Sequence, residues 1–274
     1  MDLGLKDKVA LVTGASRGIG RGIALGLAAE GANVVLCARG EDDLERAADE
    51  VRRLGAEAAT VALDITADGA PERLVDAARD RFGRLDVVVC NAGGNRRKPF
   101  ADTTGEDWQA LLDLNLLAHA RTARAALALL PERSALRQAQ GPSEGEPARD
   151  DGALVFVASI YGREAGGPGL SLYNTTKSAL ISLAKVMALE LAPRGIRVNS
   201  VAPGSILFPG GSWARRREED PEGIARFVEA ELPLGRFGTV EEVADLVTFL
   251  CSPRASLITG ACLTVDGGQS RSLI

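Results

Sequence analysis

The chain has 274 residues, and its 32 basic and 37 acidic side chains give a formal charge of −5. With 46% hydrophobic and 25% charged residues, its composition is typical of a globular protein, which excludes wholesale disorder. The mild acidity argues against a nucleic-acid partner, and no stretch approaches the ~18–20 apolar residues of a membrane span. Four scattered cysteines, a single histidine and the lack of a signal-peptide core predict a reduced, cytoplasmic protein without a metal site.

Short apolar runs alternate with longer helical stretches along the chain. Seven runs predict strands: Val9–Thr13, Asn33–Ala38, Ala58–Leu63, Leu85–Cys90, Leu154–Ala158, Ile196–Val201 and Cys262–Val265. Six stretches predict helices: Gly18–Glu30, Glu41–Leu54, Pro71–Phe82, Glu106–Leu130, Leu172–Ala192 and Val240–Leu250. The strand runs are almost continuously apolar, as in strands that are covered on both faces. The alternation therefore predicts a single α/β domain over residues 1–274, a Rossmann-type, doubly wound, seven-stranded parallel sheet with helices on both faces.

Two segments interrupt this alternation. Residues 131–151 contain one large apolar residue, and 13 of their 21 residues are charged, proline or glycine. Such a stretch buries too little surface to offset its ordering entropy, so we predict a disordered surface insertion, with a binding arm as the alternative. Residues 205–227 follow a predicted strand end, where open α/β sheets bind ligands, and they predict a substrate lid.

The first strand leads directly into Thr13-Gly-Ala-Ser-Arg-Gly-Ile-Gly20, which opens the first helix. Glycines at 14, 18 and 20 allow a tight turn and a close approach of the backbone to a diphosphate. The helix N-terminus then offers unpaired N–H groups and its positive dipole end to that anion. The turn predicts a site for a dinucleotide.

The end of the second predicted strand discriminates between the two nicotinamide dinucleotides. An acidic residue at this place would accept hydrogen bonds from the ribose 2′-hydroxyl of NAD(H). The chain has Arg39 there instead, and Arg17 lies inside the glycine turn. A guanidinium matches a 2′-phosphate with charge-assisted hydrogen bonds, so the sequence favours NADP(H), with NAD(H) as the alternative.

Tyr173 and Lys177 lie four residues apart in a predicted helix, so they share one face of it. An unperturbed tyrosine has a pKa of about 10 and is a slow proton donor or acceptor at neutral pH. A nearby ammonium favours the phenolate. We therefore expect Lys177 to lower the pKa of Tyr173 toward the working range.

With these motifs the chain resembles the short-chain dehydrogenase/reductase family from Lys8 to Gly268. Further matches are the Asn-Ala-Gly turn at residues 91–93, a Pro-Gly pair at 203–204 and Val-Asp-Gly-Gly at 265–268. The resemblance implies a catalytic set of Asn115, Ser159, Tyr173 and Lys177. Together with Arg39, it implies cofactor contacts from Gly14, Ser16, Arg17, Gly18, Ile19, Gly20, Asp64, Ile65, Asn91, Ala92, Gly93, Tyr173, Lys177, Pro203, Gly204 and Ile206.

The resemblance also implies a role for each member of the catalytic set. A hydride would pass between the nicotinamide and a carbonyl carbon while Tyr173 gives its proton to the carbonyl oxygen. Ser159 would hydrogen-bond and orient that oxygen, since donors aimed at an oxygen that gains charge stabilise the transition state. Lys177 would hold the nicotinamide ribose, and Asn115 would anchor a water in a proton relay.

The chain departs from the family pattern at two places. The spacing from Ser159 to Tyr173 is one residue longer than usual. Phe208 stands where family members often carry a threonine that contacts the nicotinamide carboxamide, so we expect Ser205 or nearby backbone groups to replace it. His119, one helical turn beyond Asn115, is expected to be structural.

The leading function is an NADPH-dependent carbonyl reductase acting on a small-molecule ketone, such as a 3-oxoacyl thioester. A sugar, polyol or steroid alcohol dehydrogenase is the alternative within the same class, and an NADP(H)-sensing binding protein is the alternative outside it. The intact catalytic set favours an enzyme, because a sensor needs no proton donor. Lys98 and Arg163 could meet an acidic substrate but are expected to be solvated. The resemblance implies a homotetramer or homodimer.

Overall fold

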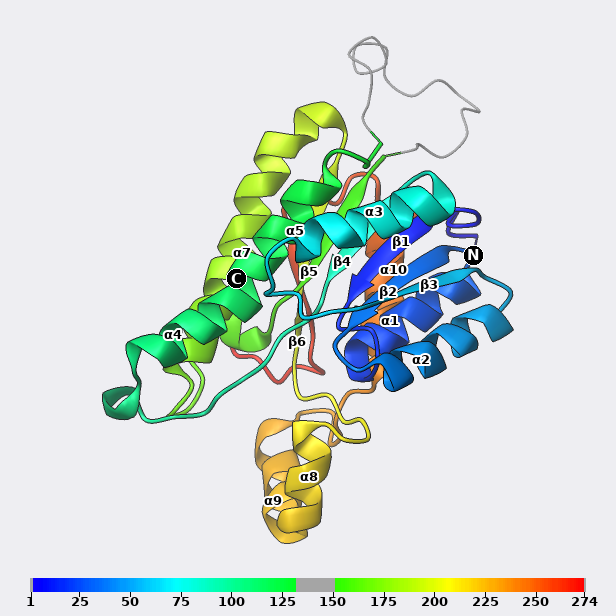
Figure 1. Ribbon diagram of the computed structural model, residues 1–274. Helices are drawn as coiled ribbons and strands as arrows, with labels where there is room; N and C mark the ends of the chain where they lie inside the picture. Colours follow the sequence, from blue (N-terminus) through cyan, green and yellow to red (C-terminus); the bar gives the residue numbers. More distant parts are fainter. Residues whose placement is uncertain (1, 132–150, 274) are drawn as a thin grey trace.

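The computed structural model describes residues 2–131 and 151–273. Its sheet has seven parallel strands in the order β3-β2-β1-β4-β5-β6-β7 (Figure 1). The strands are β1 Val9–Thr13, β2 Asn33–Ala38, β3 Ala58–Ala62, β4 Val87–Cys90, β5 Ala153–Val157, β6 Arg197–Pro203 and β7 Cys262–Val265. The predicted doubly wound sheet is confirmed, and its strand ends differ from the predicted ones by at most two residues.

Helices cover both faces of the sheet. On one face lie α1 (Gly18–Ala29), α2 (Glu41–Arg53) and α10 (Val240–Cys251). On the other lie α3 (Ala70–Phe82), α5 (Ala118–Ala126) and α7 (Ser171–Leu191). Short 3₁₀ turns are η1 Phe100–Asp102, η3 Ile160–Gly162, η4 Ala192–Arg194 and η5 Pro253–Ala255.

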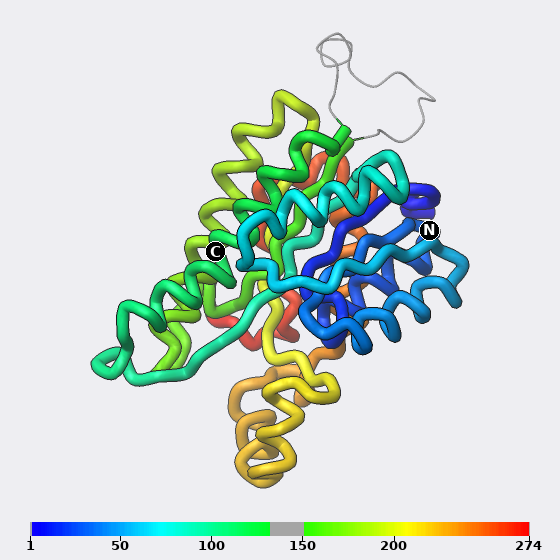
Figure 2. The backbone as a smooth tube through the Cα atoms, in the orientation of Figure 1, coloured from blue at the N-terminus to red at the C-terminus, as the bar shows by residue number. Residues whose placement is uncertain are grey.

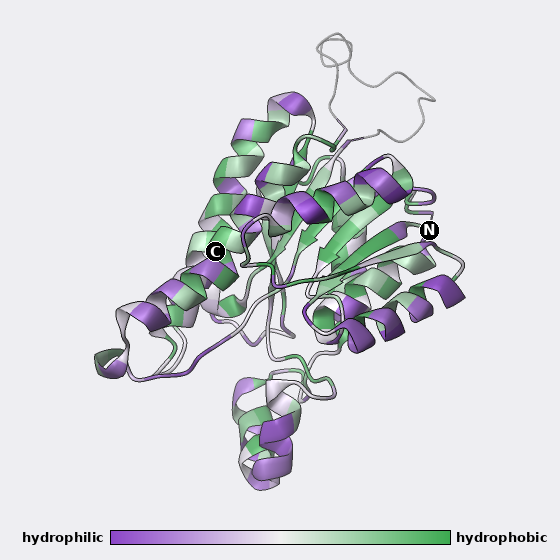
Figure 3. Cartoon of the chain, viewed as in Figure 1, coloured by the Kyte–Doolittle hydropathy of each residue, from purple (hydrophilic) through white to green (hydrophobic). Residues whose placement is uncertain are grey.

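The strands form two cores because successive side chains point to opposite faces. In β1, Ala10 and Val12 pack under α1 and α10, whereas Val9 and Leu11 pack under α3 and its neighbours. All five residues of β1 are buried, which is why the sequence reads as a continuous apolar run. Figure 3 shows apolar strands between helices whose outer faces are polar.

The helix predicted over 106–130 is interrupted. The structure has α4 (Gly105–Leu112), then a five-residue π-helical stretch, η2 (Asp113–Leu117), and then α5, which ends at Ala126. A π turn inserts one extra residue into the helical ladder and locally rotates the side chains that follow. Asn115 lies at the centre of this stretch and is fully buried.

The segment predicted to be a lid, 205–227, contains α8 (Ser212–Glu219) and most of α9 (Pro221–Glu231), which continues beyond it. They leave the sheet beyond β6 as a helical pair that stands beside the carboxyl ends of the strands (Figure 2). Trp213 stacks on Phe227 at 4.5 Å between ring centroids, and Phe237 lies 5.2 Å from Trp213. This small aromatic cluster joins the two helices to the chain that follows them.

The predicted insertion at 131–151 falls almost entirely on residues 132–150, which lie outside the described residues. No helix in the part of the chain that the structure describes is long and apolar enough to cross a membrane.

Candidate active site

Two cavities open at the carboxyl ends of the strands. The chain leaves β1 toward β2 on one side, while β4 lies on the other side of β1, and ligands bind at such a reversal in open α/β sheets. The first cavity, of about 600 Å³, lies at the ends of β1, β2 and β4. The second, of about 490 Å³, lies at the ends of β5 and β6. The loop after β4 contributes Gly93 to the first cavity and Asn95 to the second.

Most of the predicted cofactor contacts lie together in the first cavity. Those that line it are Gly14, Ser16, Arg17, Ile19, Gly20, Arg39, Asp64, Ile65, Asn91, Ala92 and Gly93. Gly204 and Tyr173 line the second cavity instead. Gly18, Lys177, Pro203 and Ile206 line neither of the two.

The glycine turn is held by the end of β4. The Asn91 side-chain amide donates hydrogen bonds to the carbonyl oxygens of Thr13 (2.9 Å) and Gly14 (3.2 Å). In return, the Thr13 hydroxyl accepts from the backbone N–H groups of Asn91 and Ala92. A Cβ on Gly20 would lie 2.2 Å from the Gly14 carbonyl oxygen, so the turn closes only with glycine there. The backbone N–H groups at the start of α1 are thereby left facing the cavity.

Gly18 has a second constraint besides its φ of +54°, which L residues rarely adopt. A Cβ at this position would lie 2.6 Å from the Phe208 ring, so that ring covers the turn at Gly18. Arg17 donates a long hydrogen bond of 3.5 Å to the carbonyl of Gly210. Both contacts hold the segment that follows Gly204 against the glycine turn.

We expect Gly18→Ala to lower the free energy of unfolding by about 1–2 kcal/mol, because the left-handed backbone is strained for alanine, and to weaken NADPH binding because Phe208 must move. Denaturant midpoints and NADPH fluorescence titration measure the two effects. Gly167→Ala is the control, since a Cβ there would meet nothing within 4 Å. Equal behaviour of the two variants would contradict the contact.

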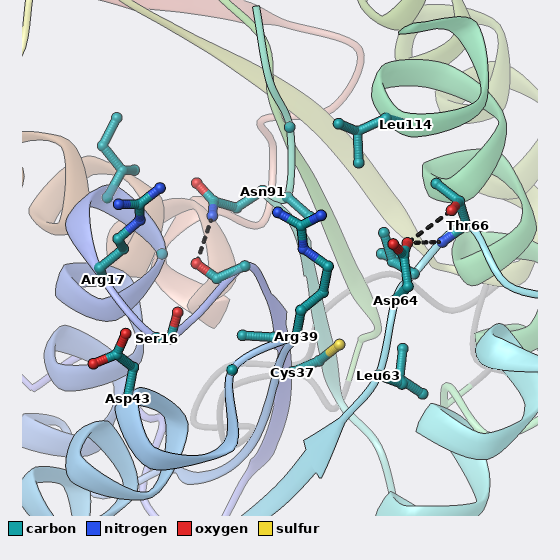
Figure 4. A pocket seen from close by; sticks show the side chains of 18 of the residues that line it. Ser16, Arg17, Cys37, Arg39, Asp43, Leu63, Asp64, Thr66, Asn91 and Leu114 are labelled. Carbon is teal, nitrogen blue, oxygen red and sulfur yellow. Dashed lines mark hydrogen bonds between the residues drawn. The ribbon is translucent and has the colours of Figure 1, made fainter. Parts of the chain in front are cut away.

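Two arginines reach one end of the first cavity. Figure 4 shows Arg17 from the glycine turn and Arg39 from the end of β2 directed toward the same space, with Ser16 and Asp43 nearby. Asp43, which also lines the cavity, forms an ion pair with Arg46 rather than with Arg39. The glycine turn and these guanidiniums together fit the diphosphate and the 2′-phosphate of a dinucleotide.

Asp64 and Thr66 form the opposite part of the first cavity. The Asp64 carboxylate accepts from the backbone N–H (2.9 Å) and the hydroxyl (2.7 Å) of Thr66, visible as dashed lines in Figure 4. These two hydrogen bonds lower the pKa of Asp64, with a smaller contribution from the charge of Arg39. The carboxylate is therefore ionised and fixed in one orientation.

Ser159 and Tyr173 line the second cavity. Ser159 follows β5, and its hydroxyl accepts from the backbone N–H of Tyr161 at 3.2 Å. Burial raises the pKa of the Tyr173 phenol, and the hydrogen bond with the Ser159 side chain opposes that rise. Both residues therefore line the same cavity, where the Ser159 side chain influences the phenol.

Lys177 is buried one helical turn beyond Tyr173. Its ammonium donates to the Val157 carbonyl at 2.8 Å and lies 5.9 Å from the centroid of the Tyr173 ring. Burial lowers the pKa of Lys177 to about 8. We expected Lys177 to lower the pKa of Tyr173. The pKa is raised instead, because burial of the phenol outweighs the other effects.

Asn115 ties three segments together. Its side-chain oxygen accepts from the Gly94 N–H at 2.9 Å, while its amide donates to the Gly94 carbonyl (2.9 Å) and the Thr176 hydroxyl (3.1 Å). A Cβ on Gly93 would lie 3.1 Å from the Asn115 oxygen and 3.6 Å from the Lys177 nitrogen. Asn115 therefore fixes the loop after β4 against α7 beside Lys177, although it lines neither cavity.

His119 is fully buried behind this set, edge-on to Phe156 at 6.5 Å. Burial lowers its pKa to about 3, with a smaller contribution from Lys177, so the imidazole stays neutral. Its place in the core agrees with the expected structural role.

Several residues of the first cavity were not found by sequence reasoning: Cys37, Ala38, Gly40, Asp43, Leu63, Thr66, Ala110 and Leu114. Most are small or apolar residues adjacent to predicted contacts, and position after a strand end was the only signal available for them. Ala110 and Leu114 come from α4 and η2, well beyond Gly93, which is the last predicted cofactor contact before them.

The geometry agrees with three comparisons. A family model described as "Enoyl-(Acyl carrier protein) reductase" matches residues 14–270. A 3-oxoacyl-acyl-carrier-protein reductase of Thermotoga maritima is 33% identical over 264 residues, covering 96% of this chain and 98% of its own length. The chain belongs to the short-chain dehydrogenase/reductase family.

Among solved structures, L-sorbose reductase from Gluconobacter frateurii complexed with NADPH and L-sorbose has a TM-score of 0.88, 34% identity and full coverage of both chains. A short-chain dehydrogenase from Burkholderia cenocepacia in complex with NADP has a TM-score of 0.82 and 32% identity, covering 97% of this chain and 98% of its own. As a member of this family, the chain is an oxidoreductase of the class that acts on CH–OH and C=O groups.

Proposed function

We propose that this family member is an NADP(H)-dependent carbonyl reductase that interconverts a ketone and a secondary alcohol. The observation that carries the proposal is that Tyr173 and Ser159 line one cavity, beside the dinucleotide-type cavity at the neighbouring strand ends. Both hydroxyls can donate to one carbonyl oxygen, which gains negative charge during reduction.

The proposed cofactor is NADP(H), with NAD(H) as the weaker alternative. Arg17 from the glycine turn and Arg39 from the end of β2 supply two guanidiniums, whereas an acidic residue after β2 would favour a 2′-hydroxyl. Two structural relatives are described with NADPH or NADP. When bound, this cofactor supplies or accepts the hydride.

Residues of this chain hold and transfer the proton and orient the substrate. Tyr173 holds a proton at its phenol oxygen for transfer to the carbonyl oxygen, and the raised pKa keeps that proton in place at neutral pH. Ser159 orients the same oxygen. Lys177, whose ammonium is fixed by Val157, provides positive charge beside the phenol as the proton leaves. Asn115 positions the loop that separates the two cavities.

We also propose a substrate lid, an oligomeric state and a cellular location for this protein. We infer that 205–227 covers the substrate within a single-domain enzyme, because Trp213 and its neighbours on α8 and α9 line the second cavity. Exposed Val186 and Leu189 on α7 support assembly into a homodimer or homotetramer. All four cysteines are free thiols, which supports a reducing cytoplasmic setting.

The function is tested by following NADPH absorbance with a panel of carbonyl compounds and alcohols in both directions. A 3-oxoacyl thioester and a ketose such as sorbose are the two main arms, since relatives of this chain are named for each. We expect NADPH-dependent reduction of at least one ketone, and slower oxidation of its alcohol. Tight NADPH binding without turnover of any carbonyl or alcohol would favour a sensor instead.

A further inference from the structure

The second cavity has one feature that the reduction of a carbonyl group does not require. Two arginines line it, Arg97 from the loop after β4 and Arg216 from α8. Among the described residues, neither guanidinium has a carboxylate within ion-pair distance. A guanidinium left beside a cavity in this way is suited to a ligand anion, because its planar donors match carboxylate and phosphate oxygens.

Arg97 is the middle member of three consecutive basic residues. Arg96 and Lys98 both bind the buried Asp107 carboxylate, at 2.7 and 2.6 Å, which fixes the loop on either side of Arg97. The Lys98 N–H also donates to the Gly169 carbonyl at 3.0 Å, and a Cβ on Gly169 would lie 2.9 Å from the Arg97 stem. Of these three basic residues, Arg97 is therefore the one that does not bind Asp107 and that lines the cavity.

Arg216 is held in place by an aromatic ring. Its guanidinium lies 4.9 Å from the centroid of Trp213, which in turn stacks on Phe227. The side chain is half-buried, so its position is set by packing rather than by solvent. Stacking on the indole keeps the planar N–H edge available for a ligand while the ring covers one face of the guanidinium.

Two carboxylates line the same cavity. Asp220 accepts from the Gly223 N–H at 2.8 Å and so caps the first turn of α9, and Glu219 is exposed. Neither is paired with Arg216, although Glu219 ends α8 and Asp220 follows it directly. The face of Trp213 that a ligand cation would need is already covered by Arg216. An anion is therefore the better match to this cavity than a cation.

The cavity also has apolar lining residues among its polar ones. Leu170, Ile224 and Phe227 line it. A ligand in this cavity can therefore place an apolar section against these three side chains. Burial of that section contributes roughly 25 cal/mol per Å² of apolar surface removed from water.

We propose that the substrate carries a carboxylate or phosphate group that Arg97 and Arg216 bind, joined through an apolar section to the carbonyl that Tyr173 and Ser159 hold. This rests on the proposed function for the position of the carbonyl, but the anion site itself does not require turnover. Lys98 and Arg163, the basic residues considered first from the sequence, do not form it: Lys98 binds Asp107, and Arg163 donates to the Cys262 carbonyl.

The test is a binding experiment with unreactive ligands of equal chain length: hexanoate, hexyl phosphate, methyl hexanoate and hexylamine. Quenching of Trp213 fluorescence reports binding in a Trp108→Phe background, because these are the two tryptophans of the chain. We expect hexanoate or hexyl phosphate to bind at least tenfold more tightly than the ester and the amine, and the stronger of the two identifies the charged group.

Substitution then assigns the site. Arg97→Gln and Arg216→Gln are each expected to weaken anion binding about tenfold without changing the affinity for methyl hexanoate or NADPH. Arg215→Gln removes the same charge from an exposed position on α8 outside the cavity and is expected to have no effect. Equal binding of anion and ester, tighter binding of the amine, or the same loss in all three variants would overturn the proposal. Failure to reduce any ketone would count against the proposed function alone.

Discussion

Tyr173→Phe is expected to lower kcat for carbonyl reduction by about 10²–10⁴-fold, which is the usual contribution of a positioned proton donor. The substitution removes one oxygen atom from the cavity wall and leaves the ring in place beside Lys177. Because the first cavity is lined by other residues, the affinity for NADPH should change little. Steady-state kinetics and NADPH fluorescence titration separate the two effects.

Tyr161→Phe is the matched control for this prediction. Tyr161 is the only other tyrosine in the sequence, it lines the same cavity, and it contacts Ser159 through its backbone N–H rather than its hydroxyl. We expect kcat to fall by less than tenfold in this variant. If Tyr173→Phe keeps a kcat close to that of the original chain, Tyr173 is not the proton donor. A large loss of kcat in Tyr161→Phe would instead indicate that the Tyr161 phenol takes part in the reaction.

The sequence predicts the sheet well because the physical signal is local. Every residue of β1, β4 and β5 is buried, so each strand is a continuous apolar run that can be recognised without knowing its neighbours. The glycine turn is equally local, since φ of +68° at Gly14 and the contact between Gly20 and Gly14 lie within eight residues. The strand order was not predicted, because right-handed connections allow more than one order in a doubly wound sheet.

The features that the sequence does not predict depend on distant partners. The apolar pattern from 106 to 130 continues through the π stretch, so nothing local marks the extra residue at Asn115 that is stabilised by Gly94 and Thr176. A basic triplet does not reveal which member lacks a partner, because Asp107 lies nine residues beyond Lys98. The pKa of Tyr173 is likewise raised by burial, which the spacing of Tyr173 and Lys177 cannot convey.

The choice between the two dinucleotides rests on the chemistry at the end of β2. Arg39 faces the first cavity, the neighbouring Asp43 is paired with Arg46, and Arg17 approaches from the glycine turn (Figure 4). A hydrogen bond between charged groups contributes about 1.5–3 kcal/mol, or roughly 10–150-fold in affinity. Loss of such a contact should therefore lower the affinity for NADPH and change the affinity for NADH very little.

We expect Arg39→Asp to weaken NADPH binding by roughly 100-fold, because a contact is lost and a carboxylate then faces the 2′-phosphate. The same carboxylate can accept from the 2′-hydroxyl of NADH, whose affinity should be unchanged or higher. Arg53→Asp, at the exposed end of α2 and outside the cavity, makes the same change of charge and should alter neither affinity. Dissociation constants for both cofactors decide the matter: a ratio of NADPH to NADH affinity that is the same in both variants would show that Arg39 does not read the ribose.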